Sequence, residues 1–253
     1  MAEPSDPLQK RRRFYKAVDV EPEGEGFAVQ LDGRMPRTPQ GRPLILPTRA
    51  LAHLIADEWR GQGDWIAHAS MPATRLAHTA IDAVGAARGP TAEGVVRYAG
   101  ADLLCYFAEG PARLVRRQEQ SWGPLLDWAR DAHGLVFTRA AGIVHHPQPP
   151  ETLARLSALL AAMDDFALAG MAFSAALFGS AILALALRDG RINADEAMAA
   201  ARLDEIFQEE QWGVDAEAAA RADAMAVEAV MAERWYGALG APRDQLVTRP
   251  PDR

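Results

Sequence analysis

The carboxylates that follow Leu203 are the residues of this sequence best placed to do chemistry. Glu205 and Glu209 are four positions apart and Glu210 follows directly, in a segment with helical periodicity. Side chains at this spacing share one face of a helix, where like charges repel. The pair could serve as a general acid and base or as half of a metal site. A solvated acidic face, or a face that docks onto a basic patch of another protein, is favoured over either chemistry.

Other signs of catalysis or cofactor binding are weak. The sequence has no phosphate-binding Gly-x-x-x-x-Gly-Lys-Ser/Thr loop and no Gly-x-Ser-x-Gly elbow, and Gly24 and Gly26 precede a predicted strand instead of opening a helix. The histidines lack metal-ligand spacing on one helix face. Cys105, the single cysteine, lies in an apolar run, so we expect an unreactive core thiol. We therefore expect no cofactor, no metal and no enzymatic activity.

The composition narrows the class of protein. Hydrophobic residues make up 49% and charged residues 24%, as in a soluble globular protein, and the net charge of −7 disfavours nucleic-acid binding. The short basic run 10–13 is interpreted as a solvated arm. No apolar run follows Met1, so no signal peptide is expected. With one cysteine and no leader, we expect a cytoplasmic protein in a bacterium, and a matrix protein for organellar relatives.

The first third of the chain has the pattern of β structure. Apolar and other residues alternate over 27–31, and Asp32-Gly33 directly afterwards is a strong hairpin signal. A return strand is predicted over 34–38, at a sheet edge because of Pro36, and a further strand over 43–46. We expect three or four antiparallel strands.

Helices are predicted from there to the end. Thr48, Asn193 with Glu196, and Asp215 are expected N-terminal caps, and Gly134 an expected C-terminal cap. The main predicted helices cover 48–59, 72–84, 111–132, 151–163, 166–187, 193–211 and a last one from 215. The predicted fold class is α+β: a small antiparallel β-rich N-terminal domain at 1–66, with a loose arm at 1–12, then a larger α-helical domain at 67–240 and a flexible tail at 241–253.

One segment has the length of a membrane span. Residues 166–187 contain no charge, but small residues dilute the run and neither flank has a basic bias. A helix that is apolar all round can be the central helix of a soluble bundle. We favour that buried helix over a membrane span.

Short motifs follow one another along the chain from about residue 13 to 213. The N-terminal pieces are Arg13-Phe14-Tyr15-Lys16, Leu31-Asp32-Gly33-Arg34, Thr38-Pro39, Leu46-Pro47, Glu58-Trp59 and Met71-Pro72. The later pieces are Asp102-Leu103-Leu104-Cys105-Tyr106, Trp122-Gly123-Pro124-Leu125-Leu126-Asp127-Trp128, Arg202-Leu203-Asp204-Glu205, Phe207-Gln208 and Trp212-Gly213. In this order the pieces resemble the assembly chaperones of the ATP synthase α subunit, and the joint match is specific although no single piece is.

The resemblance implies a chaperone that is not an enzyme. Family members bind the unassembled α subunit and cover the surface that later meets the β subunit, with a β-rich N-terminal and a helical C-terminal domain. The acidic C-terminal signature maps to Glu205, Gln208 and Trp212, and Glu58 is a further candidate contact. Apolar Ile206 departs from the family pattern. We expect a monomer that binds one protein partner.

Two other functions remain open at this level. One is an enzyme of unrecognised class that acts through Asp82, Asp102 and Glu205; the other is a small-molecule-binding protein. A deep polar pocket that joins perturbed carboxylates would favour the enzyme. An open apolar groove without convergent polar groups would favour a protein partner.

Overall fold

The chain divides into two compact units, Met1–Ala83 and Val84–Arg253. The computed structural model describes residues 11–240. The sequence places the boundary after residue 66, but α2 (Pro72–Thr79) falls in the first unit. The Glu58 carboxylate accounts for this, because it accepts hydrogen bonds from the first backbone N–H groups of α2. The predicted tail and residues 1–10 of the predicted arm lie outside the described residues, and Arg11–Arg12 form strand β1.

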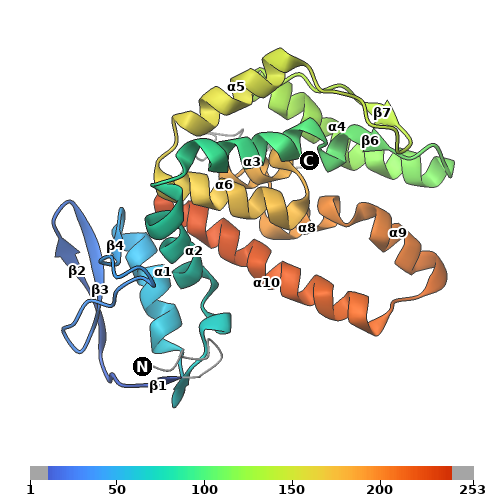
Figure 1. Ribbon diagram of the computed structural model, residues 1–253. Helices are drawn as coiled ribbons and strands as arrows, with labels where there is room; N and C mark the ends of the chain where they lie inside the picture. The colour runs from blue at the N-terminus through green and yellow to red at the C-terminus, as the bar shows by residue number, and fades with distance from the viewer. Residues whose placement is uncertain (1–10, 241–253) are drawn as a thin grey trace, which may run out of the picture. The chain divides into compact units, whose positions relative to one another are not determined.

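In the first unit, a small antiparallel sheet lies against α1 (Figure 1). Its strands, in the order β2-β3-β4, are β2 (Val18–Glu23), β3 (Gly26–Leu31) and β4 (Ile45–Leu46). Helix α1 (Arg49–Arg60) packs on the sheet and buries Leu51, Ile55 and Trp59. A second antiparallel pair joins β1 to β5 (Trp65–Ile66).

The predicted hairpin turn at Asp32-Gly33 is present, but the predicted return strand is not. Asp32 and Gly33 have φ of 49° and 75°, the positive values that a type I′ turn needs. Over 34–38 the chain makes only isolated bridges, Leu31 with Arg34 and Arg37 with Pro43. Pro36 has no N–H group to continue a ladder, which is the physical reason for the missing strand.

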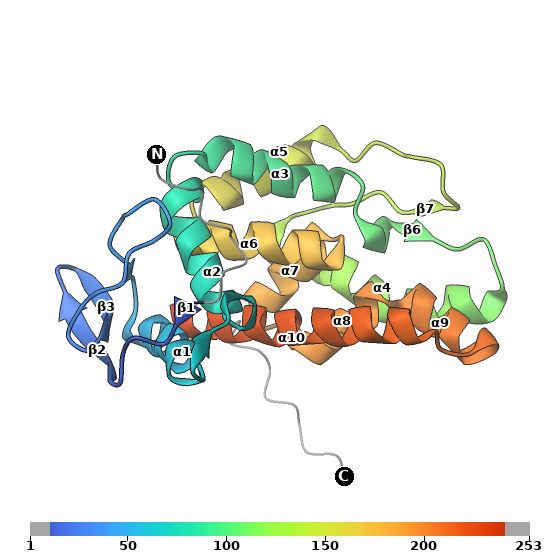
Figure 2. The same cartoon turned by 60° about the horizontal axis from the view of Figure 1, so that its bottom comes forward.

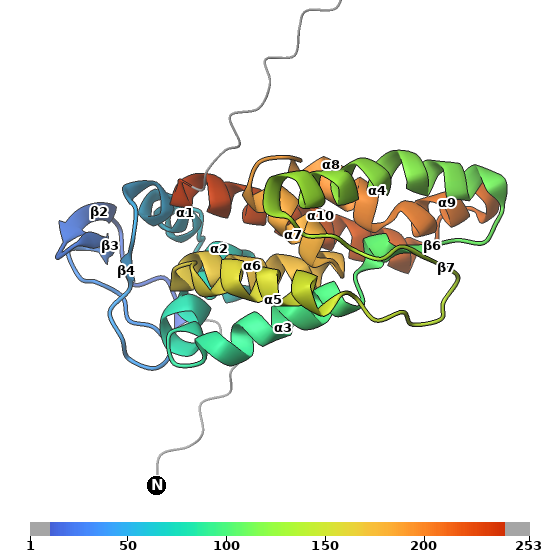
Figure 3. The same cartoon turned by 90° about the horizontal axis from the view of Figure 1, so that it is seen from above.

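The second unit is helical and is built around α7 (Ala181–Arg188). Residues 181–187 are all buried, and α3, α4, α6, α8 and α10 pack around them. Figure 2 and Figure 3 show α6 alongside α3, and α8 alongside α10. The other elements are α3 (Arg88–Gly100), η3 (Leu103–Cys105), β6 (Tyr106–Phe107), α4 (Ala112–His133), β7 (Ala140–Ala141), α5 (Pro150–Ala161), α6 (Asp165–Phe178), α8 (Ala194–Ala201), α9 (Leu203–Trp212) and α10 (Ala216–Leu239).

The long apolar segment forms two helices, not the single helix predicted over 166–187. Gly179 adopts the left-handed conformation, φ 65°, and ends α6. The Ser180 side chain then caps α7 by accepting from the Leu183 N–H group. Of the helices described over residues 11–240, none is long and apolar enough to cross a membrane.

The predicted caps are confirmed, and a second predicted helix is interrupted. Thr48 and Asp215 accept hydrogen bonds from the first turns of α1 and α10, and Asn193 with Glu196 forms a capping box on α8. The helix predicted over 193–211 breaks at Arg202 into α8 and α9. The Trp122 indole N–H donates to the Ala200 carbonyl oxygen at 3.0 Å, so a side chain of α4 takes an acceptor that a continuous helix would use.

Candidate functional site: a groove between two helices

An open groove of about 640 Å³ separates α9 from the first turns of α10. The two helices diverge from the short connection between them (Figure 1). One wall is a face of α9, the other is a face of α10, and the end of α6 lies between them. The residues that line it include Leu177, Phe178, Arg202, Glu205, Gln208, Glu209, Trp212, Ala218, Arg221, Ala222 and Met225.

Glu205, Gln208 and Trp212, predicted from the sequence as partner contacts, all line this groove. Their spacing of three and then four positions places them on one face of α9. All are exposed, Trp212 by 77%. Within residues 11–240, the Glu205 carboxylate has no ion pair or hydrogen bond, and Gln208 and the Trp212 ring have no side-chain partner. The structure therefore brings these predicted residues together and leaves their side chains available.

The other charged groups of α9 are already paired. Glu209 accepts from the Arg202 guanidinium at 2.6 Å, in a half-buried ion pair. Glu210 pairs with Arg117 at 2.8 Å, and this hydrogen bond holds the pKa of the Glu210 carboxyl below its ordinary value. Because Glu209 is engaged, Glu205 and Glu209 do not form a free acid–base pair. No group of acidic, histidine or cysteine side chains among the described residues could hold a metal ion.

The opposite face of α9 packs against α4. Leu203 and Phe207 are buried there, and the guanidinium groups of Arg113 and Arg117 lie over the Phe207 ring at 5.9 and 5.5 Å from its centroid. Ile206 is half-buried and lines a shallow depression with Arg117 of α4. An apolar side chain at position 206 is therefore consistent with a helix that is anchored on this side and open on the other.

The α10 wall is apolar and is held by its cap. The Asp215 carboxylate accepts from the Ala218 N–H group at 2.9 Å. Ala218, Ala222 and Met225 are half-buried and line the groove, whereas Ala229 and Trp235 further along α10 are buried against the bundle. Sequence reasoning missed this wall, although the spacing 218, 222, 225 is that of one helix face.

Glu58, the remaining predicted contact, belongs to the first unit and is occupied by helix capping. Its oxygens accept from the Ala73 and Thr74 N–H groups, each at 2.7 Å, and from the Thr74 hydroxyl at 2.6 Å. Burial raises the pKa of the Glu58 carboxyl in spite of these hydrogen bonds. The geometry therefore gives Glu58 a local structural role.

Asp82 and Asp102, suggested above as catalytic carboxylates, also hold local structure. Asp82 accepts from the Thr38 hydroxyl at 2.6 Å, within the first unit. Asp102 is fully buried in the second unit and accepts from the Ser180 hydroxyl at 2.7 Å and the Ile182 N–H group at 3.1 Å. Burial raises the pKa of Asp102 to about 6. Neither carboxylate lines the groove that contains Glu205.

The thiol of Cys105 is not available for chemistry. Cys105 is buried, and burial raises the pKa of its thiol, so it is unreactive as expected.

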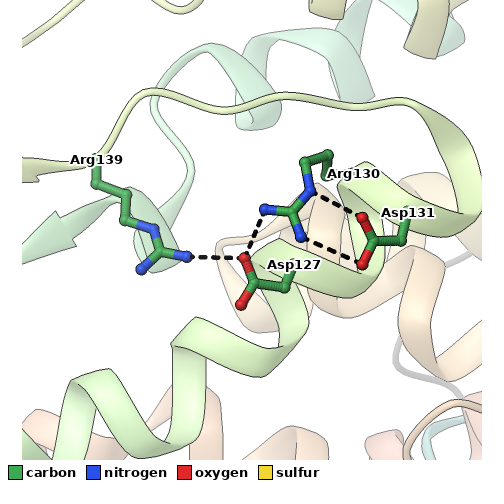
Figure 4. A network of polar contacts seen from close by, with 4 residues as sticks. All are labelled: Asp127, Arg130, Asp131 and Arg139. Atoms are coloured by element: carbon green, nitrogen blue, oxygen red, sulfur yellow. Dashed lines mark hydrogen bonds and ion pairs between the residues drawn. The ribbon is translucent and has the colours of Figure 1, made fainter.

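An exposed network of charges lies on and after α4 (Figure 4) and consists of Asp127, Arg130, Asp131 and Arg139. In it, Asp127 accepts from Arg130 at 2.9 Å and from Arg139 at 3.4 Å. The hydrogen bond from Arg130 lowers the pKa of Asp131. These charges satisfy one another and tie the segment after α4 to that helix.

Comparison with known proteins agrees with a protein-binding role. The family model of the ATP12 chaperone protein matches residues 12–130. The mitochondrial protein atp12 of Schizosaccharomyces pombe is 27% identical over 220 residues, which cover 82% of this chain and 75% of that protein. The crystal structure of Atp12 from Paracoccus denitrificans is 41% identical with a TM-score of 0.85, over 90% of this chain and 97% of that one. A mutant of the Paracoccus protein matches with 40% identity and the same TM-score.

The β-rich N-terminal unit, the helical unit and the open groove are those of a binding protein, and the comparisons place the chain among non-enzymatic assembly factors. The chain belongs to the ATP12 chaperone family, whose members are assembly factors of the ATP synthase. The family and the α+β fold class predicted from the sequence are confirmed. The family model ends before α9, whereas the likeness to the Paracoccus structure covers 90% of the chain.

Proposed function

We propose that this protein binds the unassembled α subunit of the ATP synthase, masks the surface that will meet the β subunit, and delivers the α subunit for assembly of the catalytic head. Glu205, Gln208 and Trp212 contact the α subunit in this proposal. Glu58 contributes by fixing the start of α2. For a bacterial chain we place this activity in the cytoplasm.

The observation that carries the proposal is the set of exposed, unengaged side chains at the mouth of an apolar groove. Nearby carboxylates of α9 are paired, so an unpaired Glu205 on the same helix face as an exposed Trp212 is unlike its surroundings. Aromatic residues such as tryptophan are enriched at the energetic centres of protein interfaces, and a charge without a partner in the free protein can pair with a complementary charge of the partner. A subunit made for a closed ring exposes a large apolar surface while it is alone, and covering that surface prevents self-association.

The test is a charge reversal at the groove. Glu205→Lys places a like charge against the basic group that we expect on the α subunit, and should abolish protection of the α subunit from aggregation, measured by turbidity. Because Glu205 is an exposed side chain, the free energy of unfolding should change by no more than about 0.5 kcal/mol.

The matched control is Glu93→Lys, which changes another exposed carboxylate, on α3, that does not line the groove. This variant should protect the α subunit as well as the unchanged protein does. Full protection by a folded Glu205→Lys variant would show that the docking surface lies elsewhere. Unfolding of that variant would show that Glu205 is structural.

A further inference from the structure

The walls of the groove restrict the form of its occupant. Both walls are helices, and the backbone N–H and C=O groups of a helix interior are satisfied within the helix. A strand that entered the groove would find no sheet edge to pair with and would leave its own backbone groups unsatisfied against an apolar surface. A helix satisfies its backbone internally, so a helix is the form that such a groove accepts.

The spacing of the lining residues fits the same form. Glu205 and Trp212 lie about 10 Å apart along α9, at a rise of 1.5 Å per residue, with Gln208 between them. On the facing wall, Ala218, Ala222 and Met225 form an apolar row of similar length. Small side chains such as alanine let a neighbouring helix approach closely. The groove therefore presents about two turns of complementary surface to one apolar face of a helix.

The charges that line the groove require one positive charge on the apolar face of the bound helix. Arg202 is neutralised by Glu209, and Arg221 by Glu217. Asp215 is engaged as the cap of α10. Among residues 11–240, Glu205 is therefore the carboxylate of the groove lining that has no partner. Gln208, one turn away, has a side-chain amide oxygen that can accept a hydrogen bond. A guanidinium group carries five N–H donors in a planar fork and can donate to both groups, which a single ammonium does less well.

We infer that the groove receives an amphipathic α-helix of the partner, with an arginine on its apolar face that pairs with Glu205 and Gln208, and with apolar side chains against Trp212 and the α10 row. This inference rests on the proposed function, because it describes how the α subunit would be held. It adds the form of the docked segment and the residue that the segment must carry.

Photo-crosslinking tests the form of the occupant. Arg221, exposed and on the α10 wall, is replaced by the photoreactive p-benzoylphenylalanine in the full chain, which leaves Glu205, Gln208 and Trp212 intact. After irradiation with free α subunit, mass spectrometry should place the crosslink in a segment with an arginine flanked by apolar residues three and four positions away. A proline in the middle of that segment should abolish the crosslink, since proline breaks a helix but is tolerated in an extended segment.

Charge exchange tests the pairing. Changing the identified arginine to glutamate should weaken complex formation at least tenfold, and so should Glu205→Arg in the chaperone. The two changes together should restore most of the affinity, as expected for a direct pair. Gln208→Ala should weaken binding less than either reversal.

The outcomes separate the inference from the proposed function. A crosslink to an extended or uncharged segment of the α subunit would overturn the helix inference and leave the proposed function standing. A crosslink to a second copy of this chain, or to its own residues 241–253, would overturn the inferred occupant. If the α subunit is fully protected and yet no crosslink to it forms, the groove is not the docking site. That result would overturn the role of the groove in the inference and in the proposed function.

Discussion

At the scale of single residues, the carboxylates differ in whether they accept hydrogen bonds from other groups of the protein. Asp102 and Glu58 are withdrawn from water and bound to N–H and hydroxyl groups, with no ion pair to either among the described residues. Burial therefore outweighs their hydrogen bonds, and the pKa of each is raised. Glu205 is exposed and unpaired. The first two carboxylates support the fold, and the third is available to a partner.

Asp102 should make the stability of the protein depend on pH. Its pKa is 3.8 ordinarily and about 6 in the fold, so the folded state holds its proton more tightly than the unfolded state does. The contribution of Asp102 to stability is thus fully present below about pH 4 and is lost as the pH rises through about 6. The stability difference between the unchanged protein and Asp102→Asn should be roughly 2 kcal/mol larger in favour of aspartate at pH 4.5 than at pH 7.

Urea unfolding of both proteins at the two pH values measures this difference. The titrating groups that the two proteins share contribute equally to both and cancel in the stability difference. Asp82→Asn is a suitable comparison, because Asp82 also binds a hydroxyl group but lies in the first unit. A stability difference for Asp102→Asn that is the same at both pH values would show that Asp102 is ionised in the fold at its ordinary pKa.

Glu58 should prove to be a structural residue. Glu58→Ala leaves the Ala73 and Thr74 N–H groups and the Thr74 hydroxyl without their acceptor, and unsatisfied partly buried donors cost about 1–3 kcal/mol. The neighbouring Asp57→Ala removes only an exposed ion pair with Arg60 and should cost less than about 1 kcal/mol. Chemical denaturation checks both. If Glu58→Ala keeps full stability and loses protection of the α subunit, Glu58 is a partner contact after all.

At the scale of elements, the crossing of α6 and α10 depends on the absence of one side chain. A Cβ atom at Gly170 would lie 2.8 Å from the Tyr236 ring and 3.0 Å from the Trp235 indole nitrogen. The same crossing holds a hydrogen bond from the Trp235 indole to the Phe166 carbonyl oxygen at 3.2 Å. Glycine therefore sets the distance between these helices, and the crossing supports the buried end of the α10 wall.

Gly170→Ala should destabilise the protein by about 1–3 kcal/mol, because the rings at the crossing are packed on every side and must shift. Gly94→Ala is the matched control, since a Cβ there meets only the end of the Arg97 side chain at 3.6 Å. Alanine in the interior of α3 should stabilise the protein by about 0.5–1 kcal/mol. Thermal unfolding of the two variants gives opposite shifts, and equal shifts would contradict the close approach of the helices.

Local signals were enough to predict some of these elements. Caps such as Thr48, Asn193 and Asp215 are defined by a side chain and the next few backbone groups, so the sequence predicts them directly. Helix α3 was missed because Gly89, Pro90 and Gly94 weaken its pattern. Its buried residues pack against α5 and α6, and that contact is not encoded locally. The break at Arg202 is likewise set by a distant residue, Trp122.

The candidate site was predictable in part for the same reason. Glu205, Gln208 and Trp212 share one helix and one face, so their proximity follows from helical spacing once the family resemblance draws attention to them. The facing row on α10 was not predicted, because only the tertiary fold shows where α10 leaves the bundle. Glu58 looked available in the sequence, and its acceptors are used by residues fifteen and sixteen positions away.

At the scale of the whole molecule, the apolar side chains that remain exposed come from many elements. They include Phe14 and Trp65 in the first unit, and Ile143, Trp212, Val214 and Val227 in the second. Self-association through the groove would bury the Glu205 carboxylates of both copies, while the arginines of the lining, Arg202 and Arg221, are already paired with Glu209 and Glu217, so this burial is unfavourable. The groove is therefore suited to a different protein and not to a second copy of itself.

Sedimentation velocity should accordingly show a monomer near 27.4 kDa at micromolar concentration, and a one-to-one complex when free α subunit is added. Trp212→Ala should weaken the complex without changing the sedimentation of the free chain, because Trp212 is exposed and makes no ring contact within the described residues. A dimer of the free chain that dissociates on Trp212→Ala would contradict this account.

Because Cys105 is buried, chemical labelling of its thiol can report transient opening of the helical unit. The sequence has one thiol, and it is closed off from solvent in the second unit. A thiol reagent can modify it only during moments when this region opens, so the labelling rate in native buffer measures the free energy of local opening. If reclosing outpaces labelling, the rate follows the population of the open form. Any loosening or tightening of the helical unit when free α subunit is added can then be followed with no engineered label.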